Sequence, residues 1–309
     1  MMKALVTGVG GQLGYDVMEE LKRRGYNAVG SDILESVNDD FSYISLDITD
    51  KAAVEKVINQ EKPDVIIHCA AWTAVDKAED KDNINTVRLI NAKGTENIAL
   101  ACKAVDAKMI FISTDYVFNG EGTEPWQPDC RDYAPLCVYG KTKLEGELAV
   151  SSILEKYFIV RIAWVFGKNG SNFIKTMLRI GKKFDTLKVV NDQIGTPTYT
   201  FDLSRLLVDM AESEKYGYYH ATNEGGYISW YDFTKEIFRQ TVELGYTEYS
   251  EENVVVKPVT TEEYGKSKAK RPFNSRLDKT KLAENGFTPL PHWKDALSRY
   301  LKEIDINEI

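Results

Sequence analysis

Over the first 165 residues, short runs of apolar and β-branched residues alternate with longer stretches whose apolar positions recur at helical spacing. The runs at residues 4–6, 65–67 and 109–112 are apolar at every position, as expected for strands that are buried on both faces. Alternating strands and helices are typical of a parallel sheet covered by helices. The pattern predicts strands at residues 3–7, 27–31, 42–46, 65–69, 109–113 and 158–162.

The helix predictions rest on periodicity and on signals at the helix ends. Residues 12–24 place apolar side chains at every fourth position and precede Gly25, which suits a helix C-cap. A helix that Thr49 or Asp50 can cap ends near residue 61, before Pro63. Beyond residue 165 the elements become shorter. Further helices are predicted at residues 83–105, 141–156, 171–183, 201–214 and 229–241, with a strand at 187–190.

The composition is that of an ordinary globular protein, with 43% hydrophobic and 28% charged residues among 309. The net charge is 39 − 47 = −8. Because this charge repels phosphates at long range, we expect no nucleic-acid partner and no membrane partner, and local geometry must hold any bound phosphate. The four cysteines indicate reduced thiols, and the three histidines are too dispersed for a zinc site. The sequence starts without the apolar stretch of a secretion signal, so we expect a cytoplasmic protein.

The first predicted strand leads into a glycine-rich stretch, Thr7-Gly8-Val9-Gly10-Gly11-Gln12-Leu13-Gly14, after which a helix begins. Glycines allow backbone N–H groups to approach a pyrophosphate, and a helix N-terminus adds donors and a favourable dipole. Strand, glycines and helix come in the order that dinucleotide binding requires, although a tight turn alone is the alternative interpretation. We expect the cofactor to contact Gly8, Gly11, Gln12 and Leu13.

Asp32 closes the second predicted strand, 24 residues after Gly8, where an acid that binds the adenosine ribose is expected. A carboxylate there accepts hydrogen bonds from the 2′-hydroxyl and repels a 2′-phosphate, so the sequence favours NADH over NADPH. The alternative is that Asp32 merely begins a turn. At the ends of the next two strands, Asp47 and Ile48 are expected to cover the adenine, and Ala70 and Ala71 to leave room for the cofactor.

These features predict an α/β fold, with a Rossmann-type doubly wound parallel sheet and a smaller, mixed C-terminal substrate-binding lobe. We assign residues 1–165 to the dinucleotide-binding domain, completed by parts of residues 185–222. Residues 166–309 form mainly the substrate-binding lobe.

A catalytic pattern follows the fifth predicted strand, which ends in Ser113 and Thr114. Tyr139 comes 25 residues after Thr114, and Tyr139 and Lys143 lie at i and i+4 on one helical face. We expect the lysine ammonium to favour the phenolate and so lower the pKa of Tyr139 from its ordinary value of about 10. The tyrosine can give a proton to a carbonyl oxygen that Thr114 orients, as hydride arrives. For a Tyr-x-x-x-Lys pattern alone, a solvated helix face is the usual alternative.

Over nearly its whole length the sequence resembles the extended short-chain dehydrogenase/reductase superfamily and, within it, the dTDP-4-dehydrorhamnose reductases. The resemblance implies that NADH or NADPH reduces the 4-keto group of the dTDP-sugar substrate, dTDP-6-deoxy-L-lyxo-4-hexulose, to give dTDP-L-rhamnose. The nicotinamide would supply hydride and Tyr139 the proton. The matching stretches are residues 11–14 (GQLG), 71–79 (AWTAVDKAE), 113–118 (STDYVF), 138–143 (VYGKTK), 191–198 (NDQIGTPT) and 271–277 (RPFNSRL).

The resemblance also implies roles for individual residues. Thr114, Tyr139 and Lys143 would form the catalytic triad, and Tyr139 and Lys143 would also hold the cofactor. Some family members form magnesium-linked dimers through an acid on the first helix, here Asp16, so a homodimer and magnesium are implied without identified partner ligands. Arg271, in the last matching stretch, is the expected contact for the substrate diphosphate. The other implied substrate contacts are Thr73, Val75, Asp115, Tyr116 and Trp164.

Three other interpretations share this scaffold. A 4,6-dehydratase would carry a glutamate where this chain has Tyr116. Other nucleotide-sugar 4-ketoreductases and 4-epimerases stay open, although the last two matching stretches count against an epimerase. A non-catalytic subunit that resembles the regulatory subunit of methionine adenosyltransferase would not need an intact Thr114, Tyr139 and Lys143.

Overall fold

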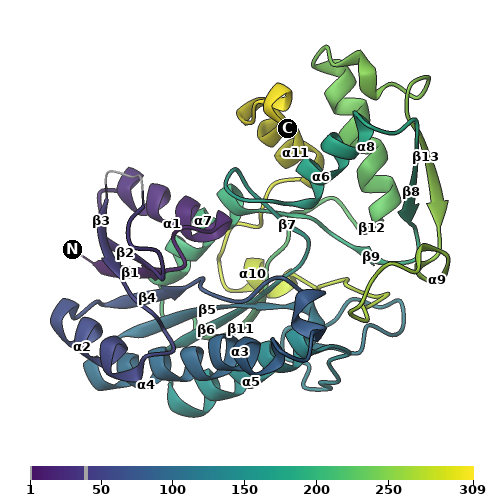
Figure 1. The fold of residues 1–309 in the computed structure, drawn as a ribbon. Helices are drawn as coiled ribbons and strands as arrows, with labels where there is room; N and C mark the ends of the chain where they lie inside the picture. The colour runs from purple at the N-terminus through teal and green to yellow at the C-terminus, as the bar shows by residue number, and fades with distance from the viewer. Residues whose placement is uncertain (1, 38–40) are drawn as a thin grey trace.

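The computed structural model describes residues 2–37 and 41–309 and shows a sheet domain beside a smaller lobe (Figure 1). The sheet domain is built on seven parallel strands in the order β11-β6-β5-β4-β1-β2-β3. The predicted Rossmann-type class is confirmed, and each of the six predicted strands lies within one residue of its predicted ends. The strands are β1 (Lys3–Thr7), β2 (Asn27–Asp32), β3 (Ser42–Ser45), β4 (Val65–His68), β5 (Lys108–Thr114), β6 (Tyr157–Ile162) and β11 (Gly217–His220).

Helices cover both faces of this sheet because its strands are apolar on both faces. In β1, Ala4 and Val6 point into one core, which α1 (Gln12–Arg23) and α7 (Thr200–Ala211) complete. Leu5 points into the opposite core. That second core lies under α2 (Lys51–Glu61), α4 (Thr95–Val105) and α5 (Val138–Ile153), as Figure 1 shows.

The chain leaves the sheet domain after β6 and later returns to it. Helix α7 packs against the same core as α1, and β11 pairs in parallel with β6. This return supports the division that we propose, in which parts of residues 185–222 complete the domain formed by residues 1–165.

The smaller lobe has a hydrophobic core of its own, rich in aromatic side chains such as Phe166, Phe233 and Tyr300. None of the described helices in either part is both long and apolar enough to cross a bilayer. The short strands of the lobe are β7 (Val165–Phe166), β8 (Thr186–Val190), β9 (Ile194–Gly195), β10 (Thr198–Tyr199), β12 (Ile228–Ser229) and β13 (Val255–Val259). The helices after β7, apart from α7, are α6 (Phe173–Gly181), α8 (Trp230–Glu243), α9 (Thr261–Tyr264), α10 (Thr280–Glu284) and α11 (Trp293–Glu303).

The single helix predicted at residues 83–105 is wrong in one respect, because a π-helical turn (η2, Leu89–Gly94) separates α3 (Ile84–Arg88) from α4. The turn contains Asn91, whose side chain accepts a hydrogen bond from the Trp72 backbone N–H at 2.8 Å and donates to the Thr142 hydroxyl at 3.2 Å. These contacts come from distant segments, and they account for the local departure from α-helical geometry.

The start of α1 lies directly against the glycine-rich loop. A Cβ atom on Gly14 would lie 2.2 Å from the carbonyl oxygen of Gly8, whereas one on Gly11 would lie 3.2 Å from that oxygen. We expect Gly14→Ala to lower the free energy of unfolding by about 1–3 kcal/mol, because the backbone must move to admit the methyl group. Gly11→Ala is the matched control and should cost less. Urea denaturation of both variants tests this, and equal losses would show that the close approach at Gly14 is unimportant.

Candidate active site

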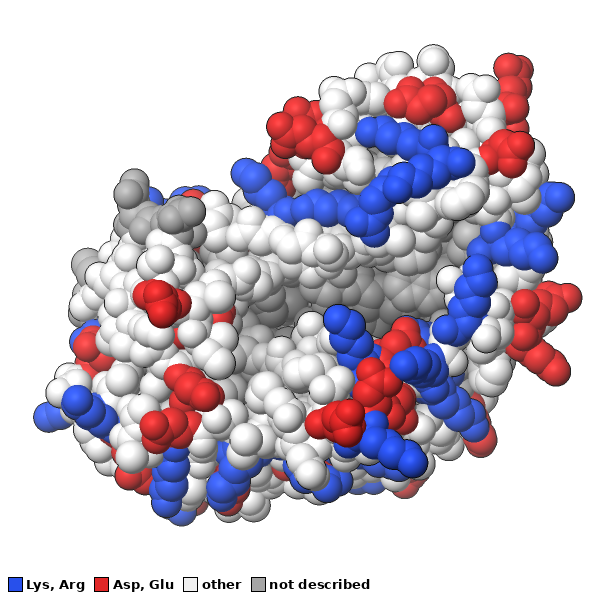
Figure 2. Space-filling model, viewed as in Figure 1, with Lys and Arg blue, Asp and Glu red and all other residues white. Residues whose placement is uncertain are grey.

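A cleft of about 560 Å³ opens at the C-terminal ends of the central strands, with the smaller lobe forming part of its wall. This volume suits a small-molecule ligand. Figure 2 shows the molecule hollowed between its two parts, with Lys and Arg side chains along the smaller lobe's side. Of the predicted site residues, the cleft is lined by Gly8, Gly11, Gln12, Leu13, Asp32, Asp47, Ile48, Ala70, Ala71, Thr73, Val75, Thr114, Asp115, Tyr116, Tyr139, Lys143 and Trp164.

The glycine-rich loop and Asp32 form one end of the cleft. The Gly8 N–H donates to the carbonyl oxygen of Ser31 at 2.8 Å, which ties the loop to the end of β2. The Asp32 carboxylate accepts from the Gly10 N–H at 3.0 Å and from the Ile33 N–H at 2.8 Å. A carboxylate has about four lone-pair sites, so this fixed group keeps acceptors for a ligand hydroxyl. The loop, the helix start and the acid therefore fit a dinucleotide.

Two segments that are far apart in sequence meet at the other end of the cleft. Thr114 ends β5, and Asp115 opens a short 3₁₀ helix, η3 (Asp115–Val117). The first turn of α5 rests on η3, since a Cβ atom on Gly140 would lie only 2.3 Å from the Tyr116 carbonyl oxygen. The Tyr139 ring packs edge-on against the Tyr116 ring, with centroids 5.5 Å apart.

The protonation of Tyr139 differs from the sequence-based prediction. Burial disfavours the phenolate and raises the pKa of Tyr139 above its ordinary value, while the nearby Thr114 hydroxyl opposes this shift. The predicted lowering of this pKa is therefore wrong here, because desolvation by burial is the largest effect on Tyr139. The tyrosine carries its proton at neutral pH, which is the form that a proton donor needs.

Lys143 is buried on the same helix face, with 3% of its surface exposed. Burial lowers the pKa of Lys143 from 10.5 to about 7, and the Glu147 carboxylate one turn further along α5 partly opposes this. The lysine Nζ lies 4.1 Å from the centroid of the Phe111 ring. Glu147 itself forms a fully buried ion pair with Arg161 at 2.7 Å. Lys143 therefore changes its charge close to neutral pH.

Asp115 brings an unpaired polar atom into the cleft. Burial raises the pKa of Asp115 to about 6, against the effect of the Ser275 and Thr114 hydroxyls. The Thr114 hydroxyl donates to Oδ1 of Asp115 at 3.0 Å, whereas Oδ2 is buried without a hydrogen-bond partner among the described residues. The hydroxyl of Ser113 is likewise unpaired. Buried polar atoms that lack a partner inside a cleft point to a ligand.

Arg271 is the one predicted site residue outside this lining. Its guanidinium binds both carboxylate oxygens of Asp76, at 3.1 and 2.7 Å. A second ion pair of 2.7 Å joins Lys268 to Asp80. Both pairs connect the segment before residue 272 to the loop that carries Thr73 and Val75, so Arg271 lies at the rim of the cleft.

Sequence reasoning missed Asn91 and Ser275. Asn91 holds the backbone of Trp72 next to the cleft, and Ser275 faces Asp115 from the smaller lobe. Asn91 lies inside a helical pattern and so gave no signal. Ser275 lies in the matching stretch 271–277, which was the available hint.

The side chain of Asp16, the acid on the first helix, is buried, and this raises the pKa of Asp16 to about 6. Within residues 2–37 and 41–309, no group of three or more His, Cys, Asp or Glu side chains is arranged to hold a metal ion. These residues belong to one chain, so magnesium shared between two chains stays a prediction from the resemblance.

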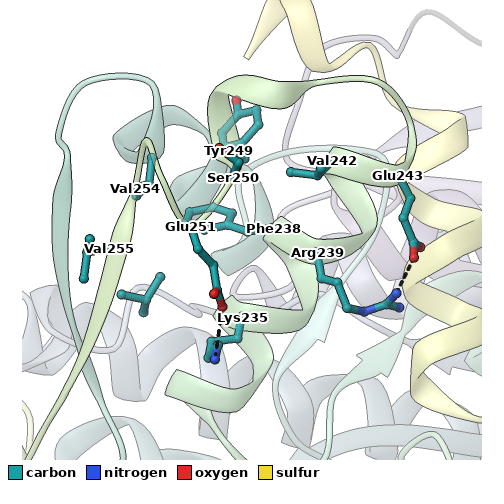
Figure 3. A pocket seen from close by; sticks show the side chains of 11 residues that line it. Lys235, Phe238, Arg239, Val242, Glu243, Tyr249, Ser250, Glu251, Val254 and Val255 are labelled. Carbon is teal, nitrogen blue, oxygen red and sulfur yellow. Dashed lines mark hydrogen bonds and ion pairs between the residues drawn. The ribbon is translucent and has the colours of Figure 1, made fainter.

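A second cavity, of about 540 Å³, lies on the smaller lobe between α8 and β13 (Figure 3). Phe238 and Tyr249 line it, and its charged side chains pair with one another. Lys235 contacts Glu251 at 3.3 Å, and Arg239 contacts Glu243 at 2.5 Å. This cavity holds no acid–base pair comparable to Tyr139 and Lys143, so we take the cleft of the sheet domain as the active site.

Comparisons with known proteins show what this chain is similar to. Residues 2–306 match the family described as "RmlD substrate binding domain". The dTDP-4-dehydrorhamnose reductase of Aggregatibacter actinomycetemcomitans is 39% identical over 96% of this chain and 97% of its own. A crystal structure of a dTDP-4-dehydrorhamnose reductase from Clostridium acetobutylicum is 42% identical, with a TM-score of 0.87 over 98% of this chain and 99% of its own. The Bacillus anthracis enzyme in complex with NADP is 39% identical, with the same TM-score and coverage.

Burial of the Lys143 ammonium should lower the free energy of unfolding of this protein. Because its pKa is about 7 in the folded chain and 10.5 in the unfolded chain, the unfolded chain binds more protons between these values, and stability should rise with pH there. We expect Lys143→Met to be more stable than wild type by a few kcal/mol at about pH 6, and by less at about pH 9. Lys141→Met, at an exposed position of the same helix, is the control. Urea denaturation at both pH values measures the difference, and a Lys143→Met variant that is less stable at the lower pH would contradict this account.

Proposed function

The chain belongs to the RmlD substrate binding domain family, and we infer that it is a nicotinamide-dependent reductase of the 4-keto group of a dTDP-sugar. The substrate is dTDP-6-deoxy-L-lyxo-4-hexulose and the product is dTDP-L-rhamnose. The observation that carries this function is that one cleft joins the glycine-rich loop and Asp32 to Thr114, Tyr139 and Lys143.

We propose that the cofactor extends along the cleft from Asp32 to Lys143. When bound, the nicotinamide supplies the hydride. Asp32 would accept from the adenosine ribose and so favour NADH, and the start of α1 would hold the pyrophosphate. Tyr139 and Lys143 would hold the nicotinamide end. The other proposed cofactor contacts are Gly8, Gly11, Gln12, Leu13, Asp47, Ile48, Ala70 and Ala71.

Tyr139 is the proposed proton donor to the 4-oxygen of the sugar. Its raised pKa keeps it protonated at neutral pH, and a donor that is ready before hydride arrives suits reduction. Thr114, beside it, would donate a hydrogen bond to the same oxygen. A charged Lys143 would stabilise the phenolate that Tyr139 becomes, which places its role after proton transfer.

Asp115 and its neighbours supply the proposed sugar contacts. The unpaired Oδ2 of Asp115 can accept a hydrogen bond from a sugar hydroxyl. Thr73, Val75, Tyr116 and Trp164 complete the walls on this side. Arg271 could meet the diphosphate at the rim only by sharing or leaving its ion pair with Asp76. The cations on the smaller lobe's side of the hollow would give an acidic chain local attraction for phosphate (Figure 2).

The site counts against the other chemistries on this scaffold. A dehydratase needs a carboxylate after Asp115, and the phenol of Tyr116 has its pKa raised by burial. A purely regulatory subunit has no need for a buried lysine beside a protonated tyrosine. We derive no step through magnesium. A homodimer is proposed from the family resemblance alone, and sedimentation would measure it.

Replacing Tyr139 by Phe should remove the proton donor and keep the shape of the cleft. We expect kcat for reduction of the dTDP-4-keto sugar to fall roughly 10²–10⁴-fold, with NADH binding nearly unchanged. Tyr157→Phe is the control, because the Tyr157 ring packs against Tyr218 at the start of β6. Steady-state kinetics and NADH titration give both quantities, and near-normal turnover by Tyr139→Phe would remove this residue from the mechanism.

Replacing Asp32 by Ala tests the cofactor preference. The variant loses an acceptor for the ribose hydroxyl and the repulsion of a 2′-phosphate, so the ratio of kcat/KM for NADH to that for NADPH should fall roughly tenfold or more. Glu35→Ala, at an exposed position just beyond Asp32, should leave the ratio unchanged. The same ratio in Asp32→Ala and wild type would place Asp32 outside the ribose site.

A further inference from the structure

Two tryptophan rings stack at the edge of the cleft. The centroids of Trp164 and Trp230 are 3.7 Å apart, and their planes differ by 17°. Trp164 lines the cleft, whereas Trp230, the first residue of α8, stands behind it in the smaller lobe. This is the tightest ring contact in the described part of the chain, and nothing in the catalytic mechanism above uses Trp230.

The backbone of Trp164 adopts an unfavourable conformation. Its φ of +52° lies in the left-handed region, where side chains other than glycine are uncommon. Its carbonyl oxygen accepts from the Thr198 N–H at 3.1 Å. On another side, a Cβ atom on Gly195 would lie 3.0 Å from Cε2 of the Trp164 ring. Strain that the surroundings hold in place is typical of functional sites.

The edge of the Trp164 ring carries an indole N–H that the stack does not use. The indole N–H groups of Trp72, Trp126 and Trp293 each donate to a backbone carbonyl oxygen. Within the described residues, the indole N–H of Trp164 has no such partner. The stack holds the Trp164 ring by its face, so the ring can present this N–H to a ligand in the cleft in one fixed orientation.

Trp230 is itself firmly held. The preceding Ser229 caps α8 in a capping box, in which its hydroxyl accepts from the Asp232 N–H at 3.0 Å and the Asp232 carboxylate accepts from the Ser229 N–H at 3.0 Å. The centroid of the Phe173 ring, on α6, lies 4.4 Å from the centroid of the Trp230 ring. The position of Trp230 is therefore set by the lobe core and by a helix N-terminus, and not by the cleft.

We propose that Trp230 is a positioning residue for the sugar nucleotide. Its ring fixes Trp164 so that the Trp164 edge and indole N–H meet the substrate in a single arrangement. This inference rests on the proposed function. It concerns only the sugar-nucleotide side of the cleft, since the proposed cofactor side is built by β1, β2 and α5.

Trp230→Leu tests this role, with Tyr231→Leu at the next position of α8 as the matched control. We expect Trp230→Leu to raise KM for the dTDP-4-keto sugar roughly three- to tenfold, with KM for NADH within about twofold of wild type. Trp230→Phe keeps an aromatic face and should restore most of the loss. The circular-dichroism couplet that two stacked indoles produce should vanish in Trp230→Leu, Trp230→Phe and Trp164→Phe alike.

Calorimetric binding of dTDP-L-rhamnose gives a measure that does not depend on turnover. If wild type binds it and Trp230→Leu binds it several-fold more weakly while NADH binding stays unchanged, the positioning role holds even if the reaction assignment fails. An unchanged affinity in a folded Trp230→Leu variant, or an equal loss for both ligands, would overturn the proposal. A wild type that binds dTDP-L-rhamnose but does not reduce the dTDP-4-keto sugar would overturn only the proposed reaction.

Discussion

Burial of a lysine ammonium beside a tyrosine hydroxyl is the constraint on which this cleft depends. Desolvation acts on both groups: it keeps the tyrosine protonated and lowers the pKa of the lysine to about 7. Glu147 could hold Lys143 fully charged, but its carboxylate is taken up by Arg161. The Phe111 ring adds only a weak attraction for the ammonium. The result is a protonated phenol next to an amine that titrates near neutral pH. An exposed tyrosine and lysine on a helix surface would not provide this combination.

Rigid elements keep this pair in place. Tyr139 and Lys143 lie on the first turns of α5, and the Val138 N–H at its start is capped by the Glu79 carboxylate at 2.7 Å. Thr114 ends a strand in the middle of the sheet. The carboxyl ends of parallel strands meet at one edge, so residues separated by long stretches of sequence converge there without a flexible loop between them.

The sequence predicted what depends on local pattern and missed what depends on distant contacts. Apolar runs located the strands, and the spacing of Tyr139 and Lys143 located the chemistry. The direction of the Tyr139 pKa shift depends on how deeply the packed chain buries it, which spacing does not encode. The pairing of Arg271 with Asp76 joins residues 195 positions apart, and the stacking of Trp230 on Trp164 likewise appears only in three dimensions.

The two parts of the molecule are tied together at the cofactor loop by one amide. Asn172 caps α6 by accepting from the Lys175 N–H at 3.0 Å. Its Nδ2 contacts Oε1 of Gln12 at 3.1 Å and the hydroxyl of Tyr300 on α11 at 2.8 Å. Gln12 opens α1 beside the glycines, while α6 and α11 belong to the core of the smaller lobe. Hydride transfer needs the nicotinamide and the ketone at a fixed distance and orientation. A link between the loop and the lobe fixes the cofactor side of the cleft relative to its sugar side before either ligand binds.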